Sequence, residues 1–406
     1  KKIKRMSSGQ QEEIPRDQDE EFEVHEADEV QQNDIEDVNE NESEGEEDIK
    51  EDQEGNLSND VIKSHLSCFG KNSDGTSWIY QKLNIAELNI KSLDALKDFP
   101  HLQDITANNN NITDLVSLRI HKDLSKLDVS NNSIEKPFDF VEAYNALEQE
   151  KESQNDQYVI HPLSILSINY SSNQISELPS NPKIYNMIKY LRVLDLSENK
   201  INSLSSLKHL CNLQELNVSS NNIESFEGIE SIKLYTLNAA KNQIKSFANI
   251  NPINLRVLNL AENQISSLDS ISNFQSLHEF HIEANNIDNV ELVLELGKIP
   301  TIRHLMIQEN PCMHVEDESP KSARTKSPLL SKTMKKVHLA LPHATILNAV
   351  QQLITLNENE ITNEQKVEAL NRFGADTQKR LDIVRDVFEV PESYDLPNDI
   401  KVGAEI

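Results

Sequence analysis

One phrase, L-x-x-L-x-L-x-x-N-x-I, recurs nine times along this chain of 406 residues. Its asparagine falls at Asn110, Asn132, Asn173, Asn199, Asn221, Asn242, Asn263, Asn285 and Asn310. Most steps between these asparagines are 21 or 22 residues, and a degenerate earlier copy, KLNIAELNI, precedes them. Because each short repeat buries its apolar face only by stacking on its neighbours, the period predicts one elongated stack of coils.

The residue types of the phrase define the shape of one coil. Each x-L-x-L-x core is a short strand whose alternate residues point inward, as Leu194 and Leu196 do. The asparagine turns the chain out of the strand, and its amide can bond the backbone of adjacent coils. The spacing between coils suits short helical or 3₁₀ turns. This is the leucine-rich-repeat pattern, and it predicts an α/β solenoid with a curved parallel sheet and short 3₁₀ or helical segments on the convex side.

Two segments interrupt the period. The step from Asn132 to Asn173 is 41 residues, so residues 136–160 form an insertion, with a helix over 138–152. Such an insertion projects from one face of the solenoid and often forms a binding feature. The second interruption, residues 313–336, is rich in Ser, Lys and Pro and predicts a flexible basic loop before a C-terminal cap at 337–348.

The two ends of the chain differ from the repeats. The first sixty residues contain 23 acidic and 6 basic side chains, more than half of the total net charge of −29. Because they bury too little apolar surface, we predict that residues 1–60 are a disordered acidic tail, which either aids solubility or docks on a basic partner. The solenoid then spans 61–348, and a helical tail, bent or broken near Gly374, spans 349–406.

Composition excludes several classes of function. An acidic chain repels phosphate backbones, so nucleic-acid binding is disfavoured and protein partners are favoured. No apolar run has the length of a bilayer-spanning helix, which predicts a protein without a membrane segment. Cys68, Cys211 and Cys312 are too few for a disulfide framework, and we interpret them as reduced cytosolic thiols, with Cys211 and Cys312 at apolar repeat positions.

Candidate binding residues follow from counting back from each asparagine. The position seven residues earlier faces solvent on the concave side, and toward the C-terminus it carries Arg and Tyr, the types that often dominate interface energy. His281 and His304 lie close to this position on the same face. The candidate partner-binding residues are therefore Arg192, Tyr235, Arg256, His278, His281, Arg303 and His304.

Catalysis has little support in the sequence. The phosphate-binding, nucleophile-elbow and zinc-protease phrases are absent, and nothing arranges Ser, His and Asp as a triad. His278, His281 and His304 could approach one another, but no Cys or carboxylate at matching spacing completes a metal site. We therefore predict no enzyme activity, cofactor or metal. Ser319 and Ser327, each followed by Pro, are candidate phosphorylation sites in the basic loop.

The chain resembles the family of leucine-rich repeat-containing protein 23, whose members are radial-spoke components of motile cilia. The resemblance rests on the lead-in HLSCFGKNSDGTSWIYQKLNIAELNIKSLDAL, the first full coil HLQDITANNNNITDL and the closing run SLHEFHIEANNIDNVELVLELGKIPTIRHLMIQENPC. An acidic tail ahead of the repeats is also typical of that family. The insertion at 136–160, the loop before the cap and the C-terminal helix depart from the pattern.

The resemblance implies a non-enzymatic structural subunit of the axoneme, part of the ciliary cytoskeleton. It implies a place in the third radial spoke, near its head, with other spoke subunits as partners and a role in ciliary motility. The alternative is a regulatory leucine-rich-repeat subunit of protein phosphatase 1, which shares the 22-residue period and has an acidic extension. That regulator has more uniform coils, without a 41-residue step.

Overall fold

The computed structural model describes residues 55, 57–71, 75–154, 159–229, 231–247, 250–251, 253–314 and 341–373. All of them belong to the compact unit Asp52–Ile406. The second unit, Lys1–Glu51, lies outside the described residues and includes most of the predicted acidic tail. Ser319, Ser327, most of the basic loop and the chain beyond 373 also lie outside them.

Thirteen strands in the described residues form one sheet, and their order in the sheet is their order in the chain. The strands are β1 (Leu66–Lys71), β2 (Trp78–Asn84), β3 (Asp104–Thr106), β4 (Lys126–Asp128), β5 (Ser167–Asn169), β6 (Val193–Asp195), β7 (Glu215–Asn217), β8 (Thr236–Asn238), β9 (Val257–Asn259), β10 (Glu279–His281), β11 (His304–Met306), β12 (Thr355–Leu356) and β13 (Asn359–Glu360). Neighbours from β2 to β12 pair in parallel, whereas β1–β2 and β12–β13 are antiparallel hairpins.

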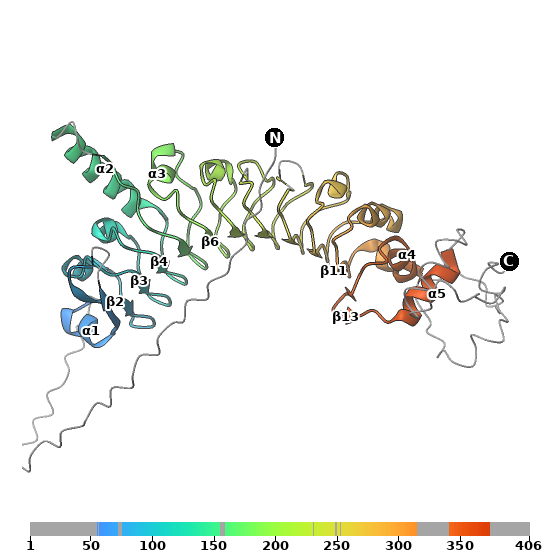
Figure 1. Ribbon diagram of the computed structural model, residues 1–406, viewed down its shortest axis with the longest axis horizontal. Helices are drawn as coiled ribbons and strands as arrows, with labels where there is room; N and C mark the ends of the chain where they lie inside the picture. The colour runs from blue at the N-terminus through green and yellow to red at the C-terminus, as the bar shows by residue number, and fades with distance from the viewer. Residues whose placement is uncertain are drawn as a thin grey trace, which may run out of the picture. The chain divides into compact units, whose positions relative to one another are not determined.

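Helical segments lie on the other side of the coils. They are α1 (Asn59–Ser64), η1 (Asp94–Asp98), η2 (Val116–Ile120), α2 (Asp139–Gln154), α3 (Pro182–Met187), η3 (Ser205–His209), η4 (Ile271–Asn273), η5 (Val290–Lys298), η6 (Pro311–His314), α4 (Leu341–Ala349) and α5 (Asn363–Phe373). Five of them, η1, η2, η3, η4 and η6, are 3₁₀ turns of three to five residues. The repeats stack in an arc with the strands on the inner side and the 3₁₀ turns on the outer side, while α1 and α5 lie at its two ends, which confirms the predicted solenoid (Figure 1).

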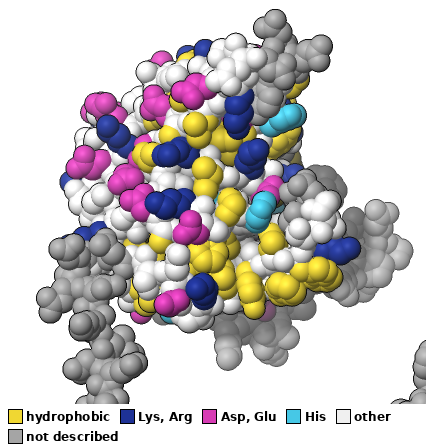
Figure 2. Space-filling model, turned by 90° about the vertical axis from the view of Figure 1, so that its left-hand side faces the viewer, with side chains coloured by type: hydrophobic (Ala, Val, Ile, Leu, Met, Phe, Trp, Pro, Cys, Tyr) yellow, Lys and Arg dark blue, Asp and Glu magenta, His cyan; other side chains and the backbone are white. Residues whose placement is uncertain are grey.

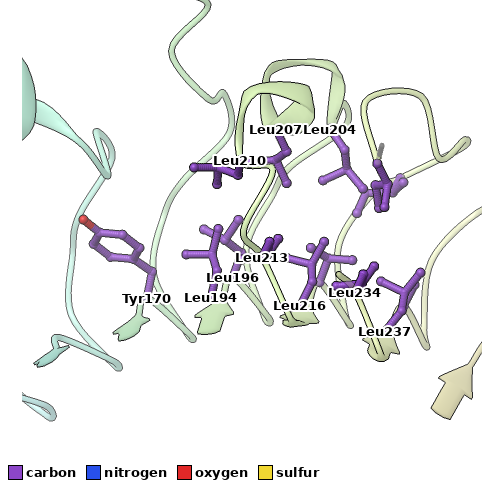
Figure 3. Packing of buried hydrophobic residues seen from close by; sticks show 14 of the residues in the cluster. Tyr170, Leu194, Leu196, Leu204, Leu207, Leu210, Leu213, Leu216, Leu234 and Leu237 are labelled. Carbon is purple, nitrogen blue, oxygen red and sulfur yellow. The ribbon is translucent and has the colours of Figure 1, made fainter. Parts of the chain in front are cut away.

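The core is a continuous column of leucine and isoleucine between the sheet and the outer turns. The middle residues of successive strands, Leu194, Leu216 and Leu237, are in register and almost fully buried. They point toward outer residues such as Leu207 and Leu210 (Figure 3). Because every coil contributes the same inward positions, the core runs along the stack without a break between domains.

The repeated asparagines connect neighbouring coils. The Asn199 amide donates to the carbonyls of Tyr170 in the preceding coil and Leu196 in its own coil, at 3.0 and 3.1 Å. Its carbonyl oxygen accepts from the Ile175 N–H at 3.0 Å. The other asparagines repeat these bonds, which satisfy backbone groups that the turn would otherwise leave buried and unpaired. The predicted structural role of these residues is confirmed.

The N-terminal end of the sheet is closed by the β1–β2 hairpin and α1. Ser58 caps α1 by accepting from the Val61 N–H at 3.4 Å, and Ile62 is fully buried against the first coil. Leu57 is buried as well. The packed structure therefore begins within the predicted tail 1–60, because these two apolar side chains cover the otherwise exposed edge of the first coil.

The insertion contains the predicted helix, as α2. Phe140, Val141 and Tyr144 anchor its first half in the core, and the second half projects from the outer side of the arc (Figure 1). The Tyr170 hydroxyl donates to the Pro137 carbonyl, which fixes the start of the insertion on the next coil.

The C-terminal end differs from the prediction. The cap is α4, but the sheet continues beyond the predicted solenoid end at 348 through β12 and β13, and α5 packs on α4. The Asn357 side-chain oxygen accepts from the Ile307 N–H at 2.9 Å, where earlier coils use the backbone carbonyl of the last strand residue, as in the bond from the Ile282 N–H to the Met306 carbonyl. The phrase LITLNEN around it is an incomplete repeat, so its strand was missed. The predicted loop 313–336 also begins too early, since η6 extends to His314.

The cysteine prediction is partly wrong. Cys312 is buried at an inward repeat position, and burial raises its pKa to about 11. Cys211 is exposed, because it lies two residues before the first leucine of its coil rather than at an inward position. Cys68, in β1, is exposed as well.

Candidate functional site: the concave face of the C-terminal coils

Six residues form a line across the concave face, each just before a strand of β6 to β11. We call them the pre-strand column: Arg192, Gln214, Tyr235, Arg256, His278 and Arg303. Each backbone N–H donates to the carbonyl of the preceding member at 2.8 or 2.9 Å. The column is therefore a continuous hydrogen-bonded row, and its side chains are partly or fully exposed.

Tyr235 lies at the middle of the column and is half-buried. Its hydroxyl donates to the Glu215 carboxylate in β7, a bond that raises the pKa of Tyr235. The nearby positive charge of Arg256 acts in the opposite direction. This bond to the neighbouring coil holds the Tyr235 side chain in place. A tyrosine loses little conformational entropy when it forms a contact, because it has only two rotatable side-chain angles.

Arg303 marks the C-terminal end of the column. Its guanidinium donates to the carbonyls of Pro300 and Ile302, both at 2.9 Å. Its own carbonyl accepts from the Ile354 N–H at 2.7 Å, which places β12 and the following α5 beside it. Lys366 of α5 is half-buried, and burial together with the positive charge of Arg303 lowers the pKa of Lys366.

The seven predicted binding residues do not form one line. Arg192, Tyr235, Arg256, His278 and Arg303 share the pre-strand column, whereas His304 begins β11 and His281 ends β10. His281 lies between two carboxylates, with Nε2 2.8 Å from Glu279 and Nδ1 3.9 Å from Glu283. His304 Nδ1 is 2.9 Å from the Thr355 hydroxyl. These histidines are therefore separate polar contacts of the sheet.

Metal binding gains no support from this arrangement. Among the residues that the structure describes, no group of three His, Cys, Asp or Glu side chains is placed to hold a metal ion. What the face offers instead is exposed guanidinium groups, an aromatic ring and hydrogen-bonding side chains. Tyr and Arg are among the residue types that most often dominate the energy of protein–protein interfaces.

Sequence reasoning missed two further features. Lys366 reaches the column from outside the repeats, so no count from an asparagine could find it. The other is an aromatic cluster on the N-terminal hairpin, where Phe69, Trp78 and Tyr80 are 61%, 62% and 49% exposed and the Phe69 and Trp78 rings stack at 5.7 Å. Hydrophobic side chains gather beside Lys and Arg on this end of the molecule (Figure 2). The alternation of aromatic residues in WIYQKLN is the pattern that indicates one face of a strand.

The coils, the asparagine ladder and the concave sheet define a leucine-rich-repeat protein. Known family patterns agree: Leucine Rich repeats (2 copies) matches residues 189–233, and Leucine Rich Repeat matches residues 254–277. Proteins of this repeat class mediate protein–protein interactions. The chain is similar to human leucine-rich repeat-containing protein 23, with 26% identity over 282 residues, covering 63% of this chain and 68% of the human protein.

Two bacterial proteins are among the solved structures with related coils. Internalin C2 of Listeria monocytogenes is 22% identical, with a TM-score of 0.42, over 52% of this chain and 87% of its own. A leucine-rich-repeat protein of Leptospira interrogans is 18% identical, with a TM-score of 0.43, over 73% of each chain.

In the described part of the chain, none of the helices is both long enough and apolar enough to cross a bilayer.

Proposed function

We propose that this chain is a non-enzymatic structural subunit of the ciliary axoneme, where it binds other subunits of a radial spoke and supports motility. The chain is similar to human leucine-rich repeat-containing protein 23, and on this family resemblance we propose a position in the third radial spoke, near its head. The proposed binding surface is the pre-strand column with His281 and His304.

The observation that carries this proposal is the unbroken exposed column across β6 to β11. A continuous row of Arg, Tyr and His on a rigid parallel sheet is a preformed interaction surface, because the backbone ladder fixes the spacing of its side chains. Such preorganisation lowers the entropic cost of binding an extended partner.

The test is to tag the full chain in a ciliated cell and to extract axonemes with salt. We expect the protein to remain with the axoneme and to localise at a radial spoke. A salt-extractable protein bound to a phosphatase catalytic subunit would instead favour the regulatory alternative and contradict the scaffold proposal.

A further inference from the structure

We propose that Arg256 and Arg303, at the C-terminal end of the pre-strand column, together with Lys366 of α5, bind an extended acidic segment of a partner protein. This inference rests on the proposed binding role and adds the chemistry of the ligand. The chain as a whole is acidic, with a net charge of −29, so several cations on one face need an explanation.

The cations at this site have no carboxylate partner inside the described part of the chain. Arg192, Arg256, Arg303 and Lys366 are absent from the ion pairs that the described residues make. Arg303 donates only to backbone carbonyls, which leave its positive charge uncompensated. Lys366 adds a further positive charge, because β12 pairs beside Arg303 and α5 follows β12, and a bound carboxylate would relieve the repulsion between the two cations.

Two carboxylates lie directly beside the column, and other groups already engage both of them. Glu215 accepts from the Tyr235 hydroxyl, and Glu279 contacts His281 at 2.8 Å. Both glutamates belong to the first position of their strands, one residue after the column. The arginine side chains therefore remain available to a ligand, in a fork geometry that matches carboxylates.

The spacing of the column favours an extended peptide. Parallel strands lie about 4.8 Å apart, so Arg256 and Arg303, two strands apart, are separated by about 10 Å along the sheet. Carboxylates on one side of an extended chain recur about every 7 Å, within reach of long, flexible arginine side chains. Nucleic acid fits less well, because the acidic chain as a whole repels a phosphate backbone.

A labelled peptide of about eight alternating glutamate and threonine residues tests the inference. A peptide of alternating lysine and threonine, with the opposite charge, is the control. The acidic peptide's length of about 26 Å matches the column. Fluorescence anisotropy with the full chain should show salt-sensitive binding of the acidic peptide only. The double variant Arg256→Glu/Arg303→Glu should weaken binding about tenfold or more, and Lys366→Glu should weaken it as well.

The matched control is Arg119→Glu/Lys208→Glu, which makes the same change in net charge on exposed residues of the outer turns. It should bind as the wild type does, and circular dichroism checks that all variants fold. Equal loss in the control, no binding by the wild type, or tighter binding of a single-stranded DNA of similar length would overturn the inference.

Expression of the tagged variants separates this inference from the proposed function. Wild-type protein at radial spokes together with an equally retained Arg256→Glu/Arg303→Glu variant would reject the acidic-ligand site and leave the spoke role intact. Loss of the double variant alone from the axoneme supports the site. Wild-type protein absent from the axoneme would reject the spoke role, whatever the peptide result.

Discussion

At the scale of single residues, the same amino acid has opposite consequences at adjacent positions. Asn221 is 7% exposed, and its amide donates to the carbonyl of Leu196 in the preceding coil at 2.9 Å while its oxygen accepts from the Ile201 N–H at 2.9 Å. Asn222, next in the chain, is exposed. The fold depends on the first and not on the second.

Asn221→Ala should therefore lower the free energy of unfolding by about 2 to 4 kcal/mol, because a buried donor and acceptor lose their partners. Asn222→Ala should change it by no more than about 0.5 kcal/mol. Urea denaturation of both variants measures the difference. Equal effects of the two substitutions would refute the ladder.

His121 is a second residue whose position determines its chemistry. It follows an outer 3₁₀ turn, at the position where other coils carry Phe99, Leu210 or Phe274. The His121 side chain is 1% exposed, and neither of its ring nitrogens has a hydrogen-bond partner. Burial lowers the pKa of His121 from 6.5 to about 4. The folded protein therefore requires the neutral ring.

Because the unfolded chain binds this proton more readily, the contribution of His121 to stability is complete above about pH 6.5. It is lost as the pH falls to about 4, by up to about 3 kcal/mol. His121→Leu should remove this loss, whereas His161→Leu, at an exposed histidine, should keep it. Denaturation midpoints of the three proteins between pH 7 and 4 measure the effect, and parallel curves for wild type and His121→Leu would contradict it.

At the scale of elements, the close approach of α4 to η5 closes the C-terminal end. A Cβ on Gly297 would lie 2.4 Å from the Ala349 carbonyl oxygen, a distance that no side chain tolerates. Glycine is therefore required where the cap rests on the last outer turn, and α5 depends on the cap in turn.

Gly297→Ala should displace α4 and lower stability by about 1 to 3 kcal/mol. Hydrogen exchange should increase first in α4, β12 and α5, since each coil is stabilised mainly by its neighbours. Leu294→Ala, at an exposed position on the same turn, is the control. Unchanged exchange in α4 of the glycine variant would show that the contact does not hold the cap.

The sequence predicts elements well where the repeat phrase is complete and poorly where it is not. Leu194 and Leu196 could be assigned inward because the strand period is two and the asparagine fixes the register. Leu356 and Asn357 were missed because their phrase lacks its last leucine. The β1–β2 hairpin was missed because β1 is an antiparallel edge strand that carries no repeat phrase.

The candidate site shows the same limit. Arg192, Arg256 and Arg303 could be placed in one column by counting, because hydrogen bonds between coils keep the register. Whether a cation has a carboxylate nearby depends on side-chain directions, and the approach of Lys366 depends on α5 folding back from beyond the cap. No local pattern encodes either.

At the scale of the whole molecule, the repeats form one rigid support with distinct features at different places. The β1–β2 hairpin with its exposed aromatic side chains caps one end, α2 projects from the outer side, and the pre-strand column crosses the inner side. Because these surfaces face different directions on one body, a single chain can hold several neighbours at fixed spacing, as a scaffold must.

The most direct test of this account is to place a photo-crosslinking amino acid at Arg256 on the concave face, and separately at Arg119 on the outer side, and to irradiate isolated axonemes. We predict a discrete adduct with another axonemal protein from position 256 and little or none from position 119. An adduct from position 119 alone would contradict the claim that the concave face of the C-terminal coils is the binding surface.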